Sequence, residues 1–186
     1  MNGAIIIDGD FNNTQHKNAV VGLSLRNNFY TNAIWNMVMR KLTPQMRRML
    51  TIKGVSKKNI EEMEERAFRK YNNYDWGFKL LMKNDVAIGF TFWDYPKPST
   101  HPNGKGCCLE YLLVDADHRG SKYGTLLMDD FVSWADTHRP VIKIQFKPDR
   151  VLVKLYKKYG FKEGRPEGME QDPAATESGL VEWYRH

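Results

Sequence analysis

The sequence contains little cysteine and no long apolar run, and both absences exclude whole classes of protein. Its two cysteines, Cys107 and Cys108, are adjacent. Neighbours in one strand point to opposite faces, so the pair cannot form the disulfide framework of a small secreted domain. No stretch approaches the roughly 20 apolar residues of a membrane-spanning helix, and residues 1–10 lack the basic start of a secretory leader. We therefore expect a cytoplasmic protein that does not enter a membrane.

The composition is that of one folded domain with a modest excess of positive charge. Of 186 residues, 41% are hydrophobic, which suffices for one ordinary core, so we expect a single domain over residues 1–186. The chain has 28 basic and 22 acidic residues, a net charge of +6. This excess favours anionic partners but does not separate nucleic acid, a membrane surface and a phosphorylated cofactor.

Residues 1–74 are expected to be mainly helical after one short strand. Residues 4–7 are rich in isoleucine and are followed by Asp8-Gly9-Asp10, which predicts a strand and then a polar, Asn-rich connection. Residues 29–42 carry apolar side chains at helical spacing. Thr43-Pro44 would begin a second helix, and Ser56 is the predicted N-cap of another.

From residue 75 onward the pattern alternates between strands and helices. Residues 76–82 and 86–93 predict a β-hairpin with an Asn84-Asp85 turn. Strands are then expected at residues 108–114, 141–146 and 180–184, and helices at residues 123–137 and 149–159. This order predicts an α/β (α+β) domain with a mixed sheet, in which residues 75–165 form the core and residues 166–186 an acidic loop and the last strand.

A polar, basic turn with two glycines lies between the strand at residues 108–114 and the helix at residues 123–137. A helix N-terminus offers unpaired N–H groups and a positive dipole, and glycine lets the backbone approach an anion closely, so this turn is a candidate phosphate loop. On spacing alone, Gly120 and Gly124 fit a simple turn into the helix as well. The Walker A and dinucleotide-binding patterns do not fit.

The same turn resembles the central motif of the GNAT superfamily of acetyl-CoA-dependent N-acetyltransferases. That motif is Gln/Arg-x-x-Gly-x-Gly/Ala after a Leu-x-Val strand, and Leu112, Val114, Arg119 and Gly124 match it. Lys122 stands where the first glycine is expected. If that position is left-handed, its side chain would cost on the order of 1 kcal/mol, which a phosphate beside the ammonium could offset.

A second motif near the C-terminus also resembles this family, which carries Leu-Tyr-x-x-x-Gly-Phe on and after a helix. Residues 155–161 read Leu-Tyr-Lys-Lys-Tyr-Gly-Phe, while Asp149 and Leu152 stand where Asn and Ala are usual. With Ile88-Gly89 in the hairpin, the resemblance covers residues 75–165. It implies a mixed, mostly antiparallel central sheet flanked by helices, with splayed central strands that hold the cofactor and an acceptor-binding region in residues 1–74.

The resemblance implies that acetyl-CoA is the cosubstrate. Leu112, Leu113 and Val114 would meet the pantetheine arm and the thioester through backbone groups, where the strands at residues 108–114 and 141–146 splay apart. The pyrophosphate would bind the N–H groups of Gly120, Ser121, Lys122, Tyr123, Gly124 and Thr125. Arg119 and Lys122 would add charge, and Asp149 and Tyr156 complete the predicted cofactor-binding set.

Tyr156 is the predicted catalytic acid and Glu110 the candidate base for direct attack by a primary amine in a ternary complex. A phenol of pKa about 10 can protonate a thiolate of pKa about 8.5, and the family uses this tyrosine in that way. Without the motif, Tyr156 would be read as a core tyrosine. Glu110 lies on the strand that approaches the thioester, but strand carboxylates are more often solvated or ion-paired, and many family members use water chains instead.

No metal site is expected. The histidines show no metal-binding spacing, and two adjacent cysteines do not make a zinc site. Free cysteines in a strand are usually small core residues. The histidines concerned are His16, His101, His118, His138 and His186.

Charge is concentrated in three segments. Residues 40–58 carry seven basic and no acidic residues: Arg40, Lys41, Arg47, Arg48, Lys53, Lys57 and Lys58. This segment is interpreted either as a solvated helical face or as a contact for RNA or an acidic protein. A second basic cluster surrounds the predicted cofactor helix: Lys143, Lys147, Arg150, Lys154, Lys157, Lys158, Lys162 and Arg165. Residues 163–179 are acidic and would draw in a cationic acceptor, such as a protein lysine, a protein N-terminus or a small amine: Glu163, Glu167, Glu170, Asp172 and Glu177.

A noncatalytic binding module that kept the fold is the alternative to an enzyme. Such a module would use the basic helices to contact RNA or an acidic protein. The departures at Lys122, Asp149 and Leu152 favour it, whereas the intact Tyr156, with the match at the central motif, favours acetyl transfer.

Overall fold

The central feature of the structure is a six-stranded sheet whose strands follow one another in chain order. The computed structural model describes residues 3–27, 44–62, 65, 74–97, 106–139, 141–166 and 179–186. The strands are β1 (Ala4–Asp8), β2 (Tyr74–Lys83), β3 (Val86–Pro96), β4 (Gly106–Val114), β5 (Val141–Phe146) and β6 (Val181–Arg185). Neighbouring strands are antiparallel except β4 and β5, which are parallel. This is the mixed, mostly antiparallel sheet that the sequence predicted.

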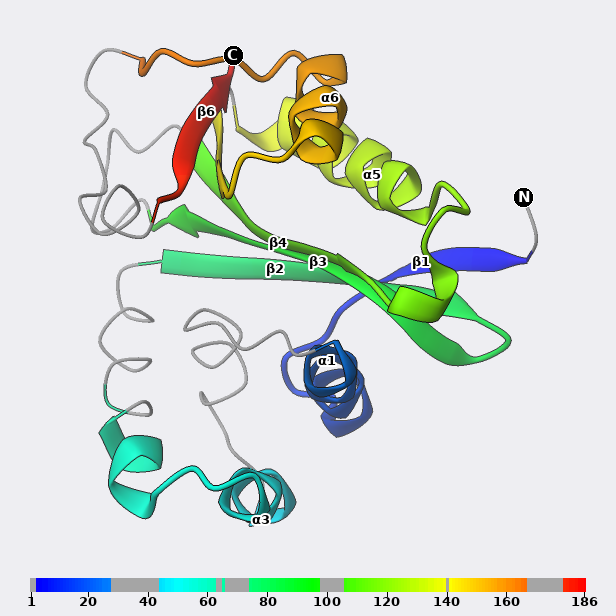
Figure 1. Cartoon of the computed structure of the whole chain (residues 1–186), viewed down its shortest axis with the longest axis vertical. Coiled ribbons are helices and arrows are strands. Elements are labelled where there is room, and N and C mark those ends of the chain that lie inside the picture. The colour runs from blue at the N-terminus through cyan, green and yellow to red at the C-terminus, as the bar shows by residue number, and fades with distance from the viewer. Residues whose placement is uncertain are drawn as a thin grey trace.

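The helices cover both faces of the sheet. They are α1 (Thr14–Arg26), α3 (Pro44–Ile52), α5 (Tyr123–His138) and α6 (Arg150–Lys158), with a 3-10 turn, η1, at Ala116–His118. Figure 1 shows α5 and α6 on one side of the sheet and α1 and α3 on the other. The helix predicted at residues 29–42 and the predicted cap Thr43 lie outside the described residues.

Local sequence chemistry explains several of these elements. Asn84 and Asp85 both have positive φ angles, 49° and 61°, as the two-residue turn of a hairpin requires. The α3 helix begins at Pro44, where the sequence predicted it. The Ser56 Oγ accepts a hydrogen bond from the Asn59 N–H at 3.1 Å, and residues 57–62 are helical, so the predicted N-cap is confirmed.

Helix α1 is an element that the sequence pattern did not predict, because its first residues were read as part of a polar connection. The Asn13 Oδ1 accepts hydrogen bonds from the N–H groups of Gln15 at 2.8 Å and His16 at 3.3 Å, which caps the helix. Val20 and Leu23 are fully buried against β2 and β3. The asparagines that suggested a loop therefore include the cap of a helix whose apolar face is buried by the sheet.

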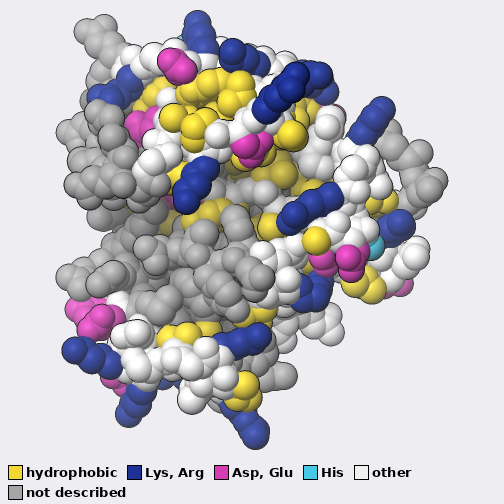
Figure 2. All heavy atoms as spheres, viewed as in Figure 1, with side chains coloured by type: hydrophobic (Ala, Val, Ile, Leu, Met, Phe, Trp, Pro, Cys, Tyr) yellow, Lys and Arg dark blue, Asp and Glu magenta, His cyan; other side chains and the backbone are white. Residues whose placement is uncertain are grey.

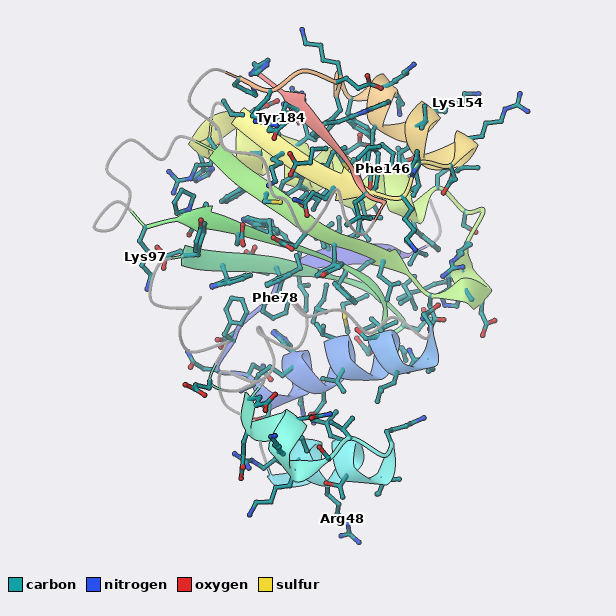
Figure 3. The ribbon with its side chains drawn as sticks, turned by 60° about the vertical axis from the view of Figure 1, so that its left-hand side comes forward. Arg48, Phe78, Lys97, Phe146, Lys154 and Tyr184 are labelled. Atoms are coloured by element: carbon teal, nitrogen blue, oxygen red, sulfur yellow. The ribbon has the colours of Figure 1, made fainter. Side chains whose placement is uncertain are left out.

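Each face of the sheet has its own core. On the α1 side the buried residues are Val20, Val21, Leu23, Phe78, Leu80, Ala87, Phe90, Phe92 and Leu113. On the α5 side they form two clusters: Trp93, Cys107, Leu109, Met128, Phe131, Ala135, Ile142, Ile144, Phe146, Tyr156, Phe161 and Trp183 in the larger, and Leu81, Ile88, Tyr123 and Leu127 in the smaller. Figure 3 shows Phe78 on the α1 side and Phe146 among the side chains near α6. Two cores on opposite faces fix the sheet between the helices.

The two cysteines lie on opposite faces of β4, as adjacent strand residues must. Both are free thiols; Cys107 is buried and Cys108 is half-buried. Burial raises the pKa of Cys107 to about 12, so this thiol stays protonated. Within the described part of the chain, no helix has the length and apolar character needed to cross a bilayer.

Candidate active site

The parallel strands β4 and β5 separate partway along the sheet. Their paired residues run from Gly106 opposite Val141 to Leu109 opposite Ile144, although β4 continues to Val114 and β5 to Phe146. On its other side β4 stays paired with β3 up to Val114. The structure thus has the splayed central strands that the sequence predicted.

A bulge in β4 lies at the start of this opening. Phe92 of β3 pairs with Tyr111, whereas the next residue, Trp93, pairs with Leu109. Glu110 is therefore the extra residue in β4, and such an insertion bends the strand and increases its twist. The bulge explains why β4 turns away from β5 immediately after Leu109.

Beyond the bulge, β4 presents backbone polar groups to the opening. The Asp115 N–H donates to the Ile88 carbonyl at 2.8 Å, and backbone groups along an antiparallel pair alternate in direction. The backbone N–H and C=O groups of Leu113 therefore point toward β3, whereas those of Leu112 and Val114 point toward β5. Of the three residues predicted to bind a ligand through the backbone, Leu112 and Val114 face the opening, and Leu113 buries its side chain in the α1-side core.

The turn after β4 leads into the N-terminus of α5. Gly120 has a φ of +81°, and a Cβ at Gly124 would meet the Leu112 Cδ2 at 3.7 Å, which is ordinary contact. The first helical hydrogen bond runs from the Leu126 N–H to the Lys122 carbonyl at 3.0 Å, and the first turn has no acidic residue. The N–H groups of Tyr123, Gly124 and Thr125 thus precede the helical ladder, an arrangement that favours an anion.

Lys122 immediately precedes α5 and has a left-handed backbone, with φ 61° and ψ 13°. This is the conformation in which glycine is favoured, and a residue with a Cβ is strained there. Lys122 is exposed, so its ammonium is free to turn toward a ligand at the helix start. The structure therefore explains why glycine is usual at this position and what the lysine could supply instead.

Replacing Lys122 with glycine should raise the free energy of unfolding by roughly 0.5–1 kcal/mol, because it removes the strain of the left-handed backbone. Urea denaturation of both proteins measures this difference. Lys122→Ala is the matched control, since it removes the ammonium but keeps the Cβ, and it should give no such gain. Equal stability of the two variants would contradict the explanation.

Arg119 does not point freely over the turn. Its Nε donates to the Val114 carbonyl at 3.2 Å, and its Nη2 donates to the Asn27 Oδ1 at 3.2 Å. The guanidinium therefore joins the end of β4 to the end of α1. The structure places Arg119 beside the candidate phosphate loop, where its guanidinium holds the backbone at Val114 and the side chain of Asn27 in place.

Helix α6 carries the second sequence motif. Asp149 is its N-cap, and its Oδ1 accepts hydrogen bonds from the N–H groups of Val151 at 2.8 Å and Leu152 at 2.9 Å. The helix ends at Lys158, and Gly160, two residues later, has a φ of +80°. The carboxylate of Asp149, predicted to contact a cofactor, is thus engaged in starting the helix.

Tyr156 is buried on the inner face of α6. Its ring is 8% exposed and lies against Phe146, with ring centroids 4.7 Å apart, and against Phe161 at 5.9 Å. Burial, with the nearby charge of Asp149, raises the pKa of Tyr156 to about 12. The phenol is therefore neutral at physiological pH and keeps the proton that a hydrogen-bond donor needs.

Three potential proton acceptors or ligands meet on the α1-side face of the sheet at the bulge. The carboxylate oxygens of Asp94 and Glu110 and the Sγ of Cys108 all lie within 4.8 Å of one another. Asp94 is buried, and Glu110 and Cys108 are half-buried. The structure therefore places the candidate base Glu110 at the point where β4 and β5 separate.

A neighbouring carboxylate, Glu182 of β6, is engaged elsewhere. Its Oε1 lies 3.2 Å from the Lys143 Nζ and accepts from the Gln145 Nε2 at 2.9 Å, and its Oε2 accepts from the Tyr184 Oη at 3.0 Å. Burial opposes its ionisation, but the hydrogen bond from Gln145 and the charge of Lys143 hold the pKa of Glu182 below its usual value. A carboxylate with three partners is a poor base, so Glu182 is not a candidate for that role.

Tyr159 is a contact residue of this region that sequence reasoning missed. Its Oη donates to the Asp129 Oδ1 at 2.5 Å and contacts the Thr125 carbonyl at 3.2 Å. These bonds tie α6 to the first turns of α5. No sequence signal could have found them, because the partners are 30 and 34 positions away.

The basic clusters lie at opposite ends of the molecule, and their described members are exposed apart from Lys143, which is half-buried beside Glu182. Arg47, Arg48, Lys53, Lys57 and Lys58 are exposed at α3 and the following turn, but Lys57 and Lys58 lie 3.8 and 3.9 Å from Glu61 and Glu62. Figure 2 shows this end and the α6 end rich in Lys and Arg, and Figure 3 shows Arg48 and Lys154 directed outward. Arg40, Lys41, His101 and residues 167–178, with Glu167, Glu170, Asp172 and Glu177, lie outside the described residues.

Comparison with known proteins identifies relatives of this arrangement. Residues 35–161 match the profile of the acetyltransferase (GNAT) family. An uncharacterised N-acetyltransferase of Methanocaldococcus jannaschii is 25% identical over an alignment of 137 residues, and the match covers 61% of this chain and 61% of that protein. The chain thus spans about three fifths of the length of this curated relative.

Solved structures share the fold at low sequence identity. An acetyltransferase from Streptococcus agalactiae superposes with a TM-score of 0.60 at 15% identity, covering 100% of this chain and 99% of that one. The PaiA N-acetyltransferase from Thermoplasma acidophilum, solved in complex with coenzyme A, gives a TM-score of 0.57 at 13% identity, with 98% of each chain covered. The fold is therefore common to both chains in these pairs over nearly their whole length.

Proposed function

This chain belongs to the acetyltransferase (GNAT) family, and on that premise we propose that it transfers the acetyl group of acetyl-CoA to a primary amine by direct attack in a ternary complex. The observation that carries the proposal is the opening between β4 and β5, which adjoins the N-terminus of α5 and the buried Tyr156. The related fold of the Thermoplasma enzyme that was solved with coenzyme A supports this choice of cosubstrate.

The arrangement of backbone groups suits a long acyl-carrying arm that is attached to a pyrophosphate. The pantetheine arm contains amide groups, and these can pair with Leu112 and Val114 as an added strand pairs with an edge. The pyrophosphate would then meet the N–H groups that begin α5, and the exposed Lys122 would add a positive charge. Both interactions use the main chain, so the side chain of Leu112 need only leave room, and Gly124 leaves room because it has no side chain.

The reaction requires a neutral amine, a polarised carbonyl and stabilisation of the departing sulfur. The amine nitrogen bonds to the thioester carbon, the C–S bond breaks, and the products are an N-acetylated amine and coenzyme A. Glu110, directly or through water, would take the proton that the amine nitrogen releases. Tyr156 would donate its hydroxyl hydrogen bond to the thiolate as it leaves; because its pKa is about 12, it is a stabilising donor of modest acidity.

The acceptor is proposed to be a cationic amine: a protein lysine, a protein N-terminus or a small amine. Asp94 and Glu110 place two carboxylates together on the α1-side face, and a carboxylate is a favourable neighbour for a cationic amine. A protonated amine would be attracted there and would then have to lose a proton before attack.

The proposed activity is tested first by calorimetry with acetyl-CoA and then by mass spectrometry. We expect micromolar binding and, in a screen of amines and cell-extract proteins, products heavier by one acetyl group. Absence of binding at high micromolar acetyl-CoA would favour the alternative, a noncatalytic module that contacts RNA or an acidic protein through the basic cluster at α3. Binding without acetylated product in the screen would contradict acetylation of the amines tested.

Glu110→Gln should reduce turnover about tenfold at pH 7, a small loss for a general base because water can replace it in part. The loss should shrink as the pH approaches the amine's own pKa of about 10.4, since the amine then needs no base. A pH series of kcat for both proteins measures this. The control is Asp85→Asn, which changes an exposed carboxylate in the hairpin turn to a residue that tolerates the same positive φ. A loss that stays constant with pH would contradict the role.

A further inference from the structure

The C-terminal end of α1 is bonded directly to the loop that connects β4 with α5. Asn27 ends α1, and its Nδ2 donates to the Leu23 carbonyl at 2.9 Å and to the Asp115 Oδ1 at 3.4 Å. Its Oδ1 accepts from the Ala116 N–H at 3.0 Å and from the Arg119 Nη2 at 3.2 Å. A side-chain amide has two donors and two acceptor positions, so this one asparagine uses its whole capacity.

These partners also fix the orientation of the amide. The Ala116 N–H and the Arg119 guanidinium can only donate, and the Leu23 carbonyl can only accept. The oxygen of Asn27 must therefore face the loop and its nitrogen must face the helix. Among the side chains, only an amide offers two donors and two acceptor positions, and the amide of glutamine lies one methylene farther from the backbone.

Arg26 strengthens the same junction. Its Nε and Nη2 donate to the Asp115 Oδ2 at 3.2 and 3.0 Å. Partial burial alone would raise the pKa of Asp115, but the hydrogen bonds from Arg26 and Asn27 hold it below its usual value. The first residue of the loop is thus ionised and held by two consecutive residues of α1.

The junction reaches the groups proposed to bind the cosubstrate. Arg119, held by Asn27, also donates to the carbonyl of Val114, the last residue of β4. The following residues, 120–122, are exposed and lead into the N–H groups of α5. One hydrogen-bonded path therefore joins α1 to both the opening of the sheet and the candidate phosphate loop.

We propose that Asn27 is a positioning residue for cosubstrate binding, which holds residues 115–119 so that the opening at Val114 and the N-terminus of α5 present their backbone groups together. This inference rests on the proposed use of acetyl-CoA. Because binding linkage is reciprocal, acetyl-CoA should in turn stabilise the last turn of α1. The coupling connects residues 115–119 with the C-terminal end of α1.

The fold should survive removal of this side chain. Helix α1 is anchored independently by Val20 and Leu23, which are fully buried against the sheet. The Asn27 N–H also keeps its hydrogen bond to the Leu23 carbonyl at 3.2 Å. A loss of affinity in a folded variant would therefore report on the loop and not on the core.

The test is calorimetry of coenzyme A, which needs no acceptor. Asn27→Ala should raise the Kd about tenfold, as expected when the hydrogen bonds that preorganise a site are lost. Asn18→Ala, at an exposed asparagine of the same helix, should leave the Kd unchanged. Once an acceptor is known, the KM for acetyl-CoA should rise while kcat changes little. An unchanged Kd for Asn27→Ala would overturn the proposal.

A second variant separates positioning from general destabilisation. Asn27→Asp keeps an oxygen to accept from the Ala116 N–H and the Arg119 Nη2 but loses the donor to the Leu23 carbonyl and Asp115. If the bonds to residues 116 and 119 position the loop, the Kd of Asn27→Asp should lie between those of the wild type and Asn27→Ala. A Kd no lower than that of Asn27→Ala would overturn the proposal.

Hydrogen exchange supplies a readout of the coupling itself. Coenzyme A should slow exchange at residues 23–27 in the wild type and have less effect in Asn27→Ala; equal protection in both would contradict the coupling. Failure of the wild type to bind coenzyme A would instead refute the proposed function, so the two failures are distinguishable.

Discussion

Tyr156→Phe should lower kcat about 100-fold while the affinity for acetyl-CoA stays close to that of the wild type. The ring would keep its packing against Phe146 and Phe161, because only the hydroxyl is removed. What is lost is a neutral hydrogen-bond donor to the departing sulfur, which carries charge only as the C–S bond breaks. Steady-state kinetics with saturating acceptor, together with calorimetry, measures both quantities.

The matched control is Tyr159→Phe, at the residue that immediately follows the same helix. Its hydroxyl is bonded to Asp129 and Thr125, so the variant should lose about 1 kcal/mol of stability but retain most of its turnover. Full activity in Tyr156→Phe would show that the second motif serves packing alone. The pKa of about 12 adds a further expectation: the wild-type rate should not decline through ionisation of this group below about pH 11.

Gly89→Ala should destabilise the protein by about 2–3 kcal/mol, because two strands pass too close for a side chain. An ideal Cβ at Gly89 would lie 2.7 Å from the Leu113 carbonyl oxygen and 3.3 Å from the Leu127 Cδ1. The first of these is backbone, which cannot rotate away, so β4 itself must shift. Urea denaturation measures the loss, and calorimetry should show weaker acetyl-CoA binding, since the shift displaces Leu112 and Val114.

Gly22→Ala is the matched control for that substitution. Gly22 lies within α1, and a Cβ there would have the Arg26 Nη1 at 3.5 Å as its nearest neighbour. Alanine favours a helix over glycine by about 0.5–1 kcal/mol, so this variant should be as stable as the wild type or more stable. A Gly89→Ala protein of wild-type stability would mean that β3 and β4 separate without cost.

Much of the fold could be predicted because it depends on local pattern. The hairpin turn at Asn84-Asp85 needs residues that tolerate positive φ, and α6 needs a cap such as Asp149. Both signals are contained in a few consecutive residues. Helix α1 was missed because its stability comes from burial of Val20 and Leu23 on a sheet that forms from distant segments.

In the candidate site, too, some residues were predicted from local motifs, whereas other features depend on the tertiary structure. Residues 119–125 and Tyr156 were found from motifs, and the left-handed backbone at Lys122 agrees with the glycine expected there. Whether these residues serve acetyl transfer stays a prediction. The bulge at Glu110, the engagement of Asp149 as a cap and the hydrogen bonds of Arg119 emerge only from strand register and side-chain geometry.

The sequence by itself determined the order of strands and helices, the turn chemistry and the two family motifs, because each follows from short-range periodicity and residue type. The tertiary structure decided what those motifs touch. Asn27 and Asp115 are 88 positions apart, and no local rule pairs them; they meet because α1 packs on β3, which β4 follows in the sheet. The separation of β4 from β5 likewise depends on the pairing of β4 with both β3 and β5. The sequence of β4 alone does not determine that pairing, because the partner strands come from other segments of the chain.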